Sequence, residues 1–302
     1  MMTPCHYISL CIFYCPKQGA WGIYPQNLTP WVPRCRAYLD RFFVIMYVLL
    51  SAHDAEHSQM KAEADEYKTR ILKQLDNTTQ VLTTLSKEYE ISDIMDDPQR
   101  LQLNIQAANS ANDFIGMLYI GSDGVGYMNT PSHSNWTGVT LQDLHPFAVE
   151  AIEKAQQGEN TVSKMFDSDV YNGKLFVYAV PVYRDGQVVG VLAASDTMEI
   201  FSDIANGDTV MGGCGYIHLI SDTGEFLVRS CNTLAKEKVE SIYDGPFLSE
   251  QTHDATPLAM ANGESTYGEF TYKGDSCHFY ITPLGMNGWY LFCANSFWDS
   301  LQ

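Results

Sequence analysis

Residues 179–192 read AVPVYRDGQVVGVL, and this stretch decides the fold. At its centre, Arg184-Asp185-Gly186 has the residue types of a tight turn, with apolar residues on both sides. The stretch therefore predicts an antiparallel β-hairpin that covers residues 175–195. Side chains alternate between the two faces of a strand, so the first strand should present two groups to opposite sides: Phe176, Tyr178 and Val180 on one, and Val177, Ala179 and Pro181 on the other.

The segments around this hairpin occur twice, about one hundred residues apart. Residues 117–124 (MLYIGSDG) match residues 216–224 (YIHLISDTG), and each pattern is a strand followed by a turn. The hairpin at 175–195 matches a second one at 278–295, which folds over Gly285-Met-Asn-Gly.

Helical connections strengthen the match between the two copies. Residues 146–157 precede Gly158-Glu-Asn-Thr, and residues 256–262 precede Gly263-Glu-Ser-Thr. Each copy thus reads strand, strand, helical connection and three more strands, an order dominated by antiparallel pairing. The prediction is an α+β fold with two PAS-like antiparallel-sheet subdomains in tandem.

A long helix should precede the two sheets. Between residues 54 and 89, apolar residues recur at spacings of three, four or seven, with no Pro or Gly. The break at Asp96-Asp97-Pro98 separates this stalk helix from a second helix at 99–111. The apolar stripe of the stalk consists of Met60, Ala64, Tyr67, Ile71, Leu75, Leu82, Leu85 and Tyr89.

The N-terminal part divides into an irregular extension, residues 1–40, and a short apolar segment, residues 41–53. Residues 42–50 are uncharged, follow several Arg residues and precede acidic ones. The run is shorter than the roughly 20 residues of a full span. It is interpreted as a membrane anchor or uncleaved signal that places the remainder outside the cytoplasm, with a buried helix as the alternative.

Composition excludes some functions. The 18 basic and 36 acidic residues give a net charge of -18, which disfavours binding to nucleic acid. The sequence lacks a phosphate-binding loop, a G-x-S-x-G elbow, H-E-x-x-H and a dinucleotide fingerprint in proper context, so no cofactor or metal is expected. Cysteines in residues 1–40 form no C-x-x-C pair, which argues against a zinc site.

These features resemble the double Cache family, the extracytoplasmic sensor domains of bacterial membrane receptors. The resemblance covers about Asp54 to Trp298 and is carried by residues 179–192, the following Ser195-Asp196 and the duplicated strand order. It implies a stalk and second helix (54–111), a membrane-distal ligand-binding subdomain (112–205) and a membrane-proximal subdomain (206–302).

The same resemblance implies a function. The module is expected to be a chemoreceptor-like signal-transduction sensor rather than an enzyme, periplasmic or extracellular, and a homodimer through the stalk helix. Receptors of this type continue into a second membrane helix and an output domain such as a cyclase or kinase, so the chain is expected to be truncated. The alternative is an extracytoplasmic hydrolase on a divergent fold, with Cys214 in a Gly-rich loop and His218 or His278 as its base.

Ligand residues also follow from the resemblance. Family members bind amino acids through an Arg and aromatic residues before the helical connection and an Asp after the long hairpin. Here His145 takes the Arg position, Phe147 the aromatic position and Asp196 the Asp position. Further candidates lie in the same subdomain: Trp136, Phe166, Asp167, Asp169 and Tyr178.

The candidate set indicates the ligand only broadly. An imidazole lacks the fixed charge and the fork of a guanidinium, which weakens the case for an α-amino acid. Acidic groups beside aromatic rings suit an amine or another cation, so an amine, an amino acid or a related metabolite is the hypothesis. Structural roles remain open too, because Asp196 has the position of a helix cap and Asp167 and Asp169 the positions of a turn.

Four cysteines in the second subdomain lie at positions that would pair them across neighbouring strands. Counting back from the turns places Cys214 opposite Cys231 and Cys277 opposite Cys293. Cross-strand disulfides and small buried core residues both fit this spacing.

Overall fold

The computed structural model describes residues 31–168, 171, 173–206, 215–230, 240–244, 250–272 and 275–296. Contacts divide the chain into two units, Met1–Ala55 and Glu56–Gln302, and both sheets belong to the second. Cys214, Cys231 and Asp169 lie outside the described residues.

One helix, α1 (Trp31–Ile91), precedes the sheets. It begins earlier than expected, because Pro33 lies in its first turn, where Pro is tolerated, and no residue from 34 to 40 breaks a helix. The expectation of an irregular segment up to residue 40 is therefore wrong for residues 31–40. The predicted apolar stripe is buried from Met60 to Tyr89, except for the partly buried Leu85.

A short break follows α1. After the 3-10 turn η3 (Asp93–Asp96), Asp97 caps α2 (Pro98–Ala111): its Oδ1 accepts hydrogen bonds from the backbone N–H of Gln99, at 2.9 Å, and of Arg100, at 3.3 Å. The predicted second helix is confirmed to within one residue of its start.

The first sheet has seven strands, in the order β3-β2-β1-β7-β6-β4, with β5 also paired to β6. The predicted hairpin is β6–β7, and its turn residues Asp185 (φ 53°) and Gly186 (φ 79°) have the left-handed conformations that tight hairpin turns need. The elements of this part are β1 (Gly116–Gly121), β2 (Gly126–Asn129), β3 (Trp136–Val139), η4 (Leu141–Asp143), α3 (Pro146–Gln156), β4 (Thr161–Val162), β5 (Phe166–Ser168), β6 (Gly173–Arg184), β7 (Gln187–Thr197), η5 (Met198–Phe201) and α4 (Ser202–Asn206).

The second sheet repeats the central order. Its strands run β9-β8-β12-β11-β10, so β8 and β12 correspond to β1 and β7 at the centre of the first sheet. The tandem α+β fold is thereby confirmed. Its elements are β8 (Gly215–Ser221), β9 (Phe226–Val228), α5 (Glu250–Ala261), β10 (Thr266–Tyr272), β11 (Asp275–Pro283) and β12 (Trp289–Ser296).

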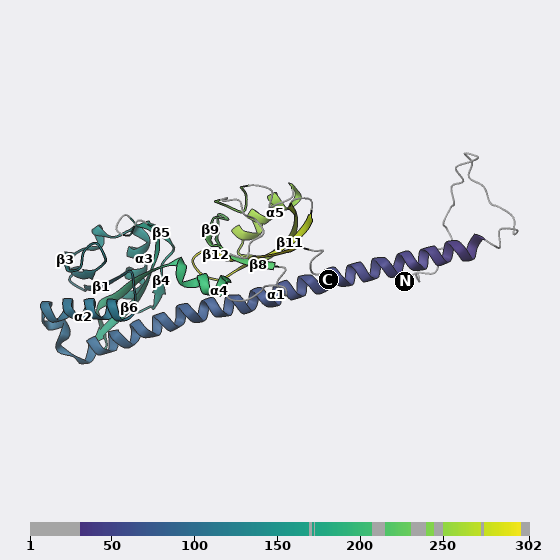
Figure 1. Ribbon diagram of the computed structural model, residues 1–302. Coiled ribbons are helices and arrows are strands. Elements are labelled where there is room, and N and C mark those ends of the chain that lie inside the picture. Colours follow the sequence, from purple (N-terminus) through teal and green to yellow (C-terminus); the bar gives the residue numbers. More distant parts are fainter. Residues whose placement is uncertain are drawn as a thin grey trace. The chain divides into compact units, whose positions relative to one another are not determined.

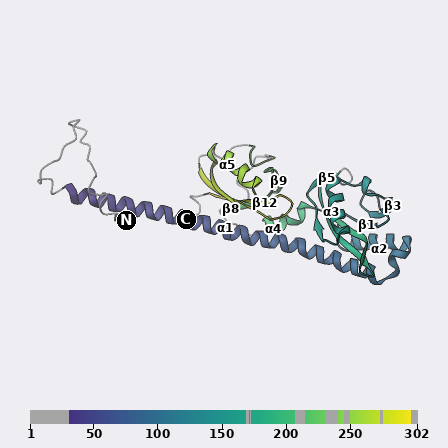
Figure 2. The ribbon, with the colours of Figure 1, turned by 180° about the vertical axis from the view of Figure 1, so that it is seen from behind.

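Each sheet packs on α1 with one face and carries a helix on the other. Phe176, Tyr178 and Val180 belong to a cluster with the buried stripe of α1, whereas Val177 and Ala179 pack with α3. The predicted alternation along β6 is confirmed. Figures 1 and 2 show both sheets along the same side of the part of α1 that follows residue 55, with α3 and α5 on their far sides.

Specific contacts join α1 to the second sheet. Glu56, near the start of this unit, is buried, and its Oε2 lies 2.8 Å from His278 Nδ1. The amide of Asn295 donates to Glu56 Oε1 at 3.3 Å. Further along the helix, Lys68 Nζ donates to the carbonyl oxygen of Pro283 at 2.7 Å.

Of the two interpretations of Cys277 and Cys293, the disulfide is wrong, and both side chains are buried in the core. In the observed register Cys277 pairs with Ser296 and Cys293 with Tyr280, and neither cysteine forms a disulfide. A register with Cys277 opposite Cys293 would place Thr282 opposite Gly288, but Gly288 (φ 67°) belongs to the turn, and Thr282 pairs with Leu291. The observed register is shifted by three residues from the one that a disulfide would need, so the two cysteines do not lie opposite each other.

The apolar run from Phe42 to Leu50 forms part of α1, and all nine of its side chains are exposed. Within the part of the chain that the structure describes, no helix has an apolar stretch long enough to cross a membrane.

Candidate ligand-binding cavity

A cavity of about 350 Å³ lies between the central strands β1, β7 and β6 of the first sheet and a cover formed by η4 and α3 together with the edge strands β3 and β5. This volume is at the lower end of the range for small-molecule sites, about 300–1,000 Å³. The opposite face of the same sheet packs against α1. A ligand in the cavity would thus be separated from the long helix by a single layer of strands.

The floor of the cavity is apolar. Leu118 of β1, Leu175 and Val177 of β6 and Ala193 of β7 are buried there. Ala193 is small, and Gly116 at the start of β1 has no side chain, which leaves room above the sheet. The floor favours the apolar part of a ligand.

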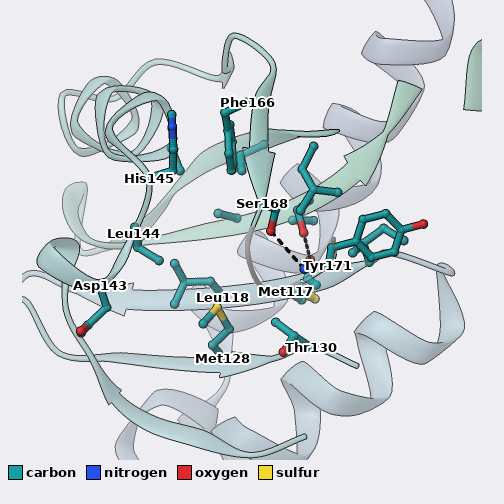
Figure 3. A pocket seen from close by; sticks show the side chains of 18 of the residues that line it. Met117, Leu118, Met128, Thr130, Asp143, Leu144, His145, Phe166, Ser168 and Tyr171 are labelled. Carbon is teal, nitrogen blue, oxygen red and sulfur yellow. Dashed lines mark hydrogen bonds between the residues drawn. The ribbon is translucent and has the colours of Figure 1, made fainter. Parts of the chain in front are cut away.

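His145 and Phe166 form one wall. Their rings are stacked, with centroids 4.3 Å apart and planes only 5° from parallel. Figure 3 shows the two rings side by side across the cavity from Leu118 and Met128.

His145 also caps α3. Its Nδ1 accepts a hydrogen bond from the backbone N–H of Phe147 at 3.2 Å. This nitrogen therefore has no proton, and in the neutral ring the proton is on Nε2.

Two acidic residues lie at the rim. Asp143 Oδ2 accepts hydrogen bonds from the backbone N–H and the hydroxyl of Thr140, both at 2.8 Å. These hydrogen bonds, the backbone one first, lower the pKa of the Asp143 carboxyl below its ordinary value, so it is ionised at neutral pH. Asp167, on β5, is exposed and pairs across the strands with Lys174, whereas its neighbour Phe166 pairs with Leu175 of the cavity floor, so the Asp167 side chain lies on the other face of this strand pair.

Several lining residues were missed by sequence reasoning. Ser195 lines the cavity from β7, and its hydroxyl lies 3.4 Å from the carbonyl oxygen of Gly116. Ser168 Oγ accepts a hydrogen bond from the backbone N–H of Tyr171 at 3.3 Å. The alternation of β7 would have identified Ser195, whereas the loop residues Thr130 and Tyr171 and Gln142 of the short η4 left no periodic signal.

Of the eight predicted ligand residues, four line the cavity: Trp136, His145, Phe166 and Asp167. Phe147 does not, because its ring packs edge-on against His145 and beneath Lys164.

The structure also corrects the predictions for Tyr178 and Asp196. Both residues lie on the α1 face of the first sheet: Tyr178 belongs to the apolar cluster with α1, and Asp196 pairs across the strands with Phe176 of the same cluster. Burial raises the pKa of the Asp196 carboxyl to about 6, although its Oδ1 accepts a hydrogen bond from the backbone N–H of Thr197. Asp196 is thus a group of the helix–sheet interface.

Two sheets in tandem behind a long helix, with a covered cavity in the first sheet, are the double Cache type of sensory fold, so the fold expected from the resemblance is confirmed. No family model matches the chain, and no curated protein matches it either.

Several solved structures of sensory domains are similar to this chain over nearly their own full length. The sensory domain of the Campylobacter jejuni chemoreceptor Tlp3, with isoleucine bound, has a TM-score of 0.59 at 11% identity, covering 83% of this chain and 98% of that one. The ligand-binding domain of the Pseudomonas aeruginosa amino acid chemoreceptor PctB, in complex with L-Arg, has a TM-score of 0.52 at 17% identity, with coverages of 80% and 94%. The extracellular domain of the putative histidine kinase mmHK1S-Z2 has a TM-score of 0.56 at 14% identity, with coverages of 82% and 98%.

Proposed function

We propose that this chain is the extracytoplasmic sensor module of a membrane receptor, which binds a small molecule in the cavity of the first sheet. The observation that carries the proposal is the position of this cavity, directly across one sheet from α1. Closure of the cover on a ligand would shift the strands against the helix, and a ligand with different affinities for the two arrangements would change their populations. The fold shared with the chemoreceptor and kinase domains supports the same function.

Calorimetric titration of the full chain with a panel of amines, amino acids, small carboxylates and nucleobases tests this proposal. An Ala193→Leu variant, which fills the floor of the cavity, should lose binding of any ligand found. Ala62→Leu, at an exposed position of α1, is the matched control and should keep it. Binding that survives in Ala193→Leu would contradict the location of the site.

Binding fits the cavity better than hydrolysis does. Among the described lining residues, the hydroxyls of Ser168 and Ser195 have backbone partners, and His145 Nδ1 is occupied by Phe147. The bases considered for a Cys214 nucleophile are both engaged: His218 Nδ1 accepts from Ser230 N–H at 2.8 Å, and His278 is paired with Glu56. Burial holds the pKa of His218 at about 3, so this imidazole is neutral.

The proposal includes attachment to the cell membrane through the segment around residues 42–50. The apolar side chains of this run are exposed on all sides of the helix rather than along one stripe. This arrangement suits contact with lipid better than packing against another protein helix. Arg residues before the run and Asp54 after it favour a sensor outside the cytoplasm. Flotation of the full chain with liposomes tests this: replacing Val44, Val48 and Leu50 with Ser should release the protein from the lipid fraction.

We also propose that two copies pair along α1, as the resemblance implies. The side of α1 away from both sheets is exposed, with Lys73, Asp76, Gln80, Thr84 and Lys87 on it. Spin labels at Gln80 should report a distance between copies that changes when ligand is added, and light scattering should give twice the chain mass. A monomeric mass at every protein concentration would contradict the pairing.

A further inference from the structure

We propose that the cavity takes an uncharged small molecule with a largely apolar body and one polar end that both donates and accepts hydrogen bonds, such as an alcohol or a carboxamide. This inference rests on the sensor function proposed above and assigns the chemical class of its ligand. It follows from which side chains turn toward the cavity and which charged groups are engaged elsewhere.

The cations of the first subdomain are engaged away from the cavity. Residues 112–205 contain four Lys and Arg residues, and each contacts a residue that does not line the cavity. Lys154 Nζ lies 2.8 Å from Glu150, Lys164 lies over the ring of Phe147, Lys174 pairs with Glu225, and Arg184 Nη1 lies 2.9 Å from Asp96. An anionic ligand would lose its hydration in the cavity without gaining a cation as a partner.

The N-terminus of α3, which borders the cavity, is also occupied. Anions bind at helix N-termini through unpaired backbone N–H groups. Here Pro146 has no N–H, that of Phe147 donates to His145 Nδ1, and that of Ala148 donates to the carbonyl oxygen of His145 at 2.9 Å. A carboxylate would have to displace hydrogen bonds that the helix makes with its own capping residue.

The acidic residues at the rim turn away from the cavity. Asp167 pairs across the strands with Lys174, so its side chain lies on the face of β5 opposite to Phe166. The Asp143 carboxylate accepts both of its hydrogen bonds from Thr140, and Figure 3 shows it directed outward. Among the described residues that line the cavity, no carboxylate therefore points inward to pair with an ammonium.

The side chains that face the cavity are mostly apolar. Leu175, Val177 and Ala193 form the floor, and Phe166 stands in the wall above it. Transfer of apolar surface from water to such surroundings is favourable and does not depend on direction. These groups therefore favour the apolar body of a ligand over any charged part.

Two hydroxyls on the same face of the sheet suit a neutral polar group. Ser168 follows Phe166 by two residues in β5 and so faces the same side. Its Oγ accepts a hydrogen bond from the backbone N–H of Tyr171 (Figure 3), which leaves the hydroxyl proton to be donated. The Ser195 hydroxyl donates to the carbonyl oxygen of Gly116 at 3.4 Å, which leaves its lone pairs to accept. An alcohol or a carboxamide can use both kinds of contact.

Two series of compounds that differ only at one end test this assignment. Isothermal titration of the full chain would use two neutral amides, 4-methylpentanamide and 3-phenylpropanamide. Each would be compared with the carboxylate and the primary amine of the same carbon skeleton, and with leucine or phenylalanine respectively. At least one amide should bind, and at least about tenfold more tightly than each of its charged relatives, because an ion would be desolvated without a partner.

Substitutions in the lining test the contacts. Ser195→Ala should weaken binding of the amide about two- to tenfold, because one hydrogen bond is lost. Ser122→Ala makes the same change at an exposed turn position outside the cavity and should leave the affinity unchanged. Ala193→Leu, which fills the floor, should abolish binding.

The outcomes separate the ligand class from the function itself. A carboxylate, amine or amino acid that binds as tightly as its amide, and no longer binds to Ala193→Leu, would overturn the neutral ligand and leave the sensor function standing. Unchanged amide affinity in Ser195→Ala would overturn the role of this hydroxyl. Amide binding that Ala193→Leu does not affect would overturn both the ligand class and the proposed site, and failure of every compound to bind would overturn the ligand class.

Discussion

Ser195 and Asp196 are neighbours in β7 and face opposite sides of the first sheet. Ser195 pairs with Val177 and lines the cavity, while Asp196 pairs with Phe176 on the face that packs against α1. Two consecutive residues thus connect the cavity and the helix interface through the thickness of one strand. Asp196, which was predicted to bind the ligand, therefore belongs to the interface between the first sheet and α1. Ligand binding would disturb this interface.

The stability of the protein should fall as pH rises through the titration of Asp196. Burial raises the pKa of this carboxyl from 3.8 to about 6, so the folded state holds its proton more tightly than the unfolded state. The stabilisation is complete below about pH 4 and is lost between about pH 4 and pH 6. Since Asp196 is partly exposed, screening should reduce the effect to about 1–2 kcal/mol.

Urea unfolding at pH 4 to 8 measures this effect. Asp196→Asn should flatten the pH dependence and stabilise the protein at pH 7 by a similar amount, about 1–2 kcal/mol. Asp185→Asn makes the same charge change in an exposed turn where Asn tolerates the positive φ, and it should keep the wild-type pH profile. Identical profiles for wild type and Asp196→Asn would contradict the prediction.

Glu56→Ala should destabilise the protein by about 3–5 kcal/mol, because it leaves His278 and Asn295 without their buried partner. Thermal unfolding followed by circular dichroism gives the change. Glu66→Ala is a matched control on the same helix, since its side chain is exposed, and it should cost less than about 0.5 kcal/mol. Equal losses in the two variants would show that the buried contact contributes nothing.

Phe176 and Trp289 should be energetically coupled. Their rings meet edge to face, with centroids 5.5 Å apart, and they join the two sheets. Replacing either with Leu should destabilise the fold, and a double-mutant cycle should give a coupling of about 0.5–1.5 kcal/mol. Purely additive losses would indicate that the two rings contribute independently.

Cys293 should react with iodoacetamide only after unfolding. The side chain is fully buried, and burial raises the pKa of its thiol, so the native state offers little accessible thiolate. Mass spectrometry of peptides from the native and the urea-unfolded protein measures the labelling. A peptide that links Cys277 to Cys293 under non-reducing conditions would contradict the observed register.

The sequence was informative where a pattern repeats over many residues. The stripe from Met60 to Tyr89 and the alternation in residues 175–195 each involve many side chains, so one irregular position does not change the prediction. The duplicated segments then predicted two sheets with the same strand order, which the structure confirms.

Predictions that depended on counting to a single residue were less secure. The resemblance placed Asp196 at the ligand, but neighbouring residues of a strand face opposite sides, and it is Ser195 that lines the cavity. The turn before Trp289 includes Asn287 and Gly288, both with positive φ, so its length could not be read from the flanking strands. Thr130 and Tyr171 reach the cavity from loops, where no period constrains a prediction.

The buried stripe of α1 packs in one cluster with Phe176 of the first sheet and Leu291 of the second. Neither half of the duplication is therefore a self-sufficient folding unit, because each takes part of its interior from a helix encoded ahead of both. Recombination that replaced one sheet alone would leave apolar surface exposed unless the stretch of α1 that packs against that sheet were replaced as well. The two sheets therefore depend for part of their stability on one and the same helix.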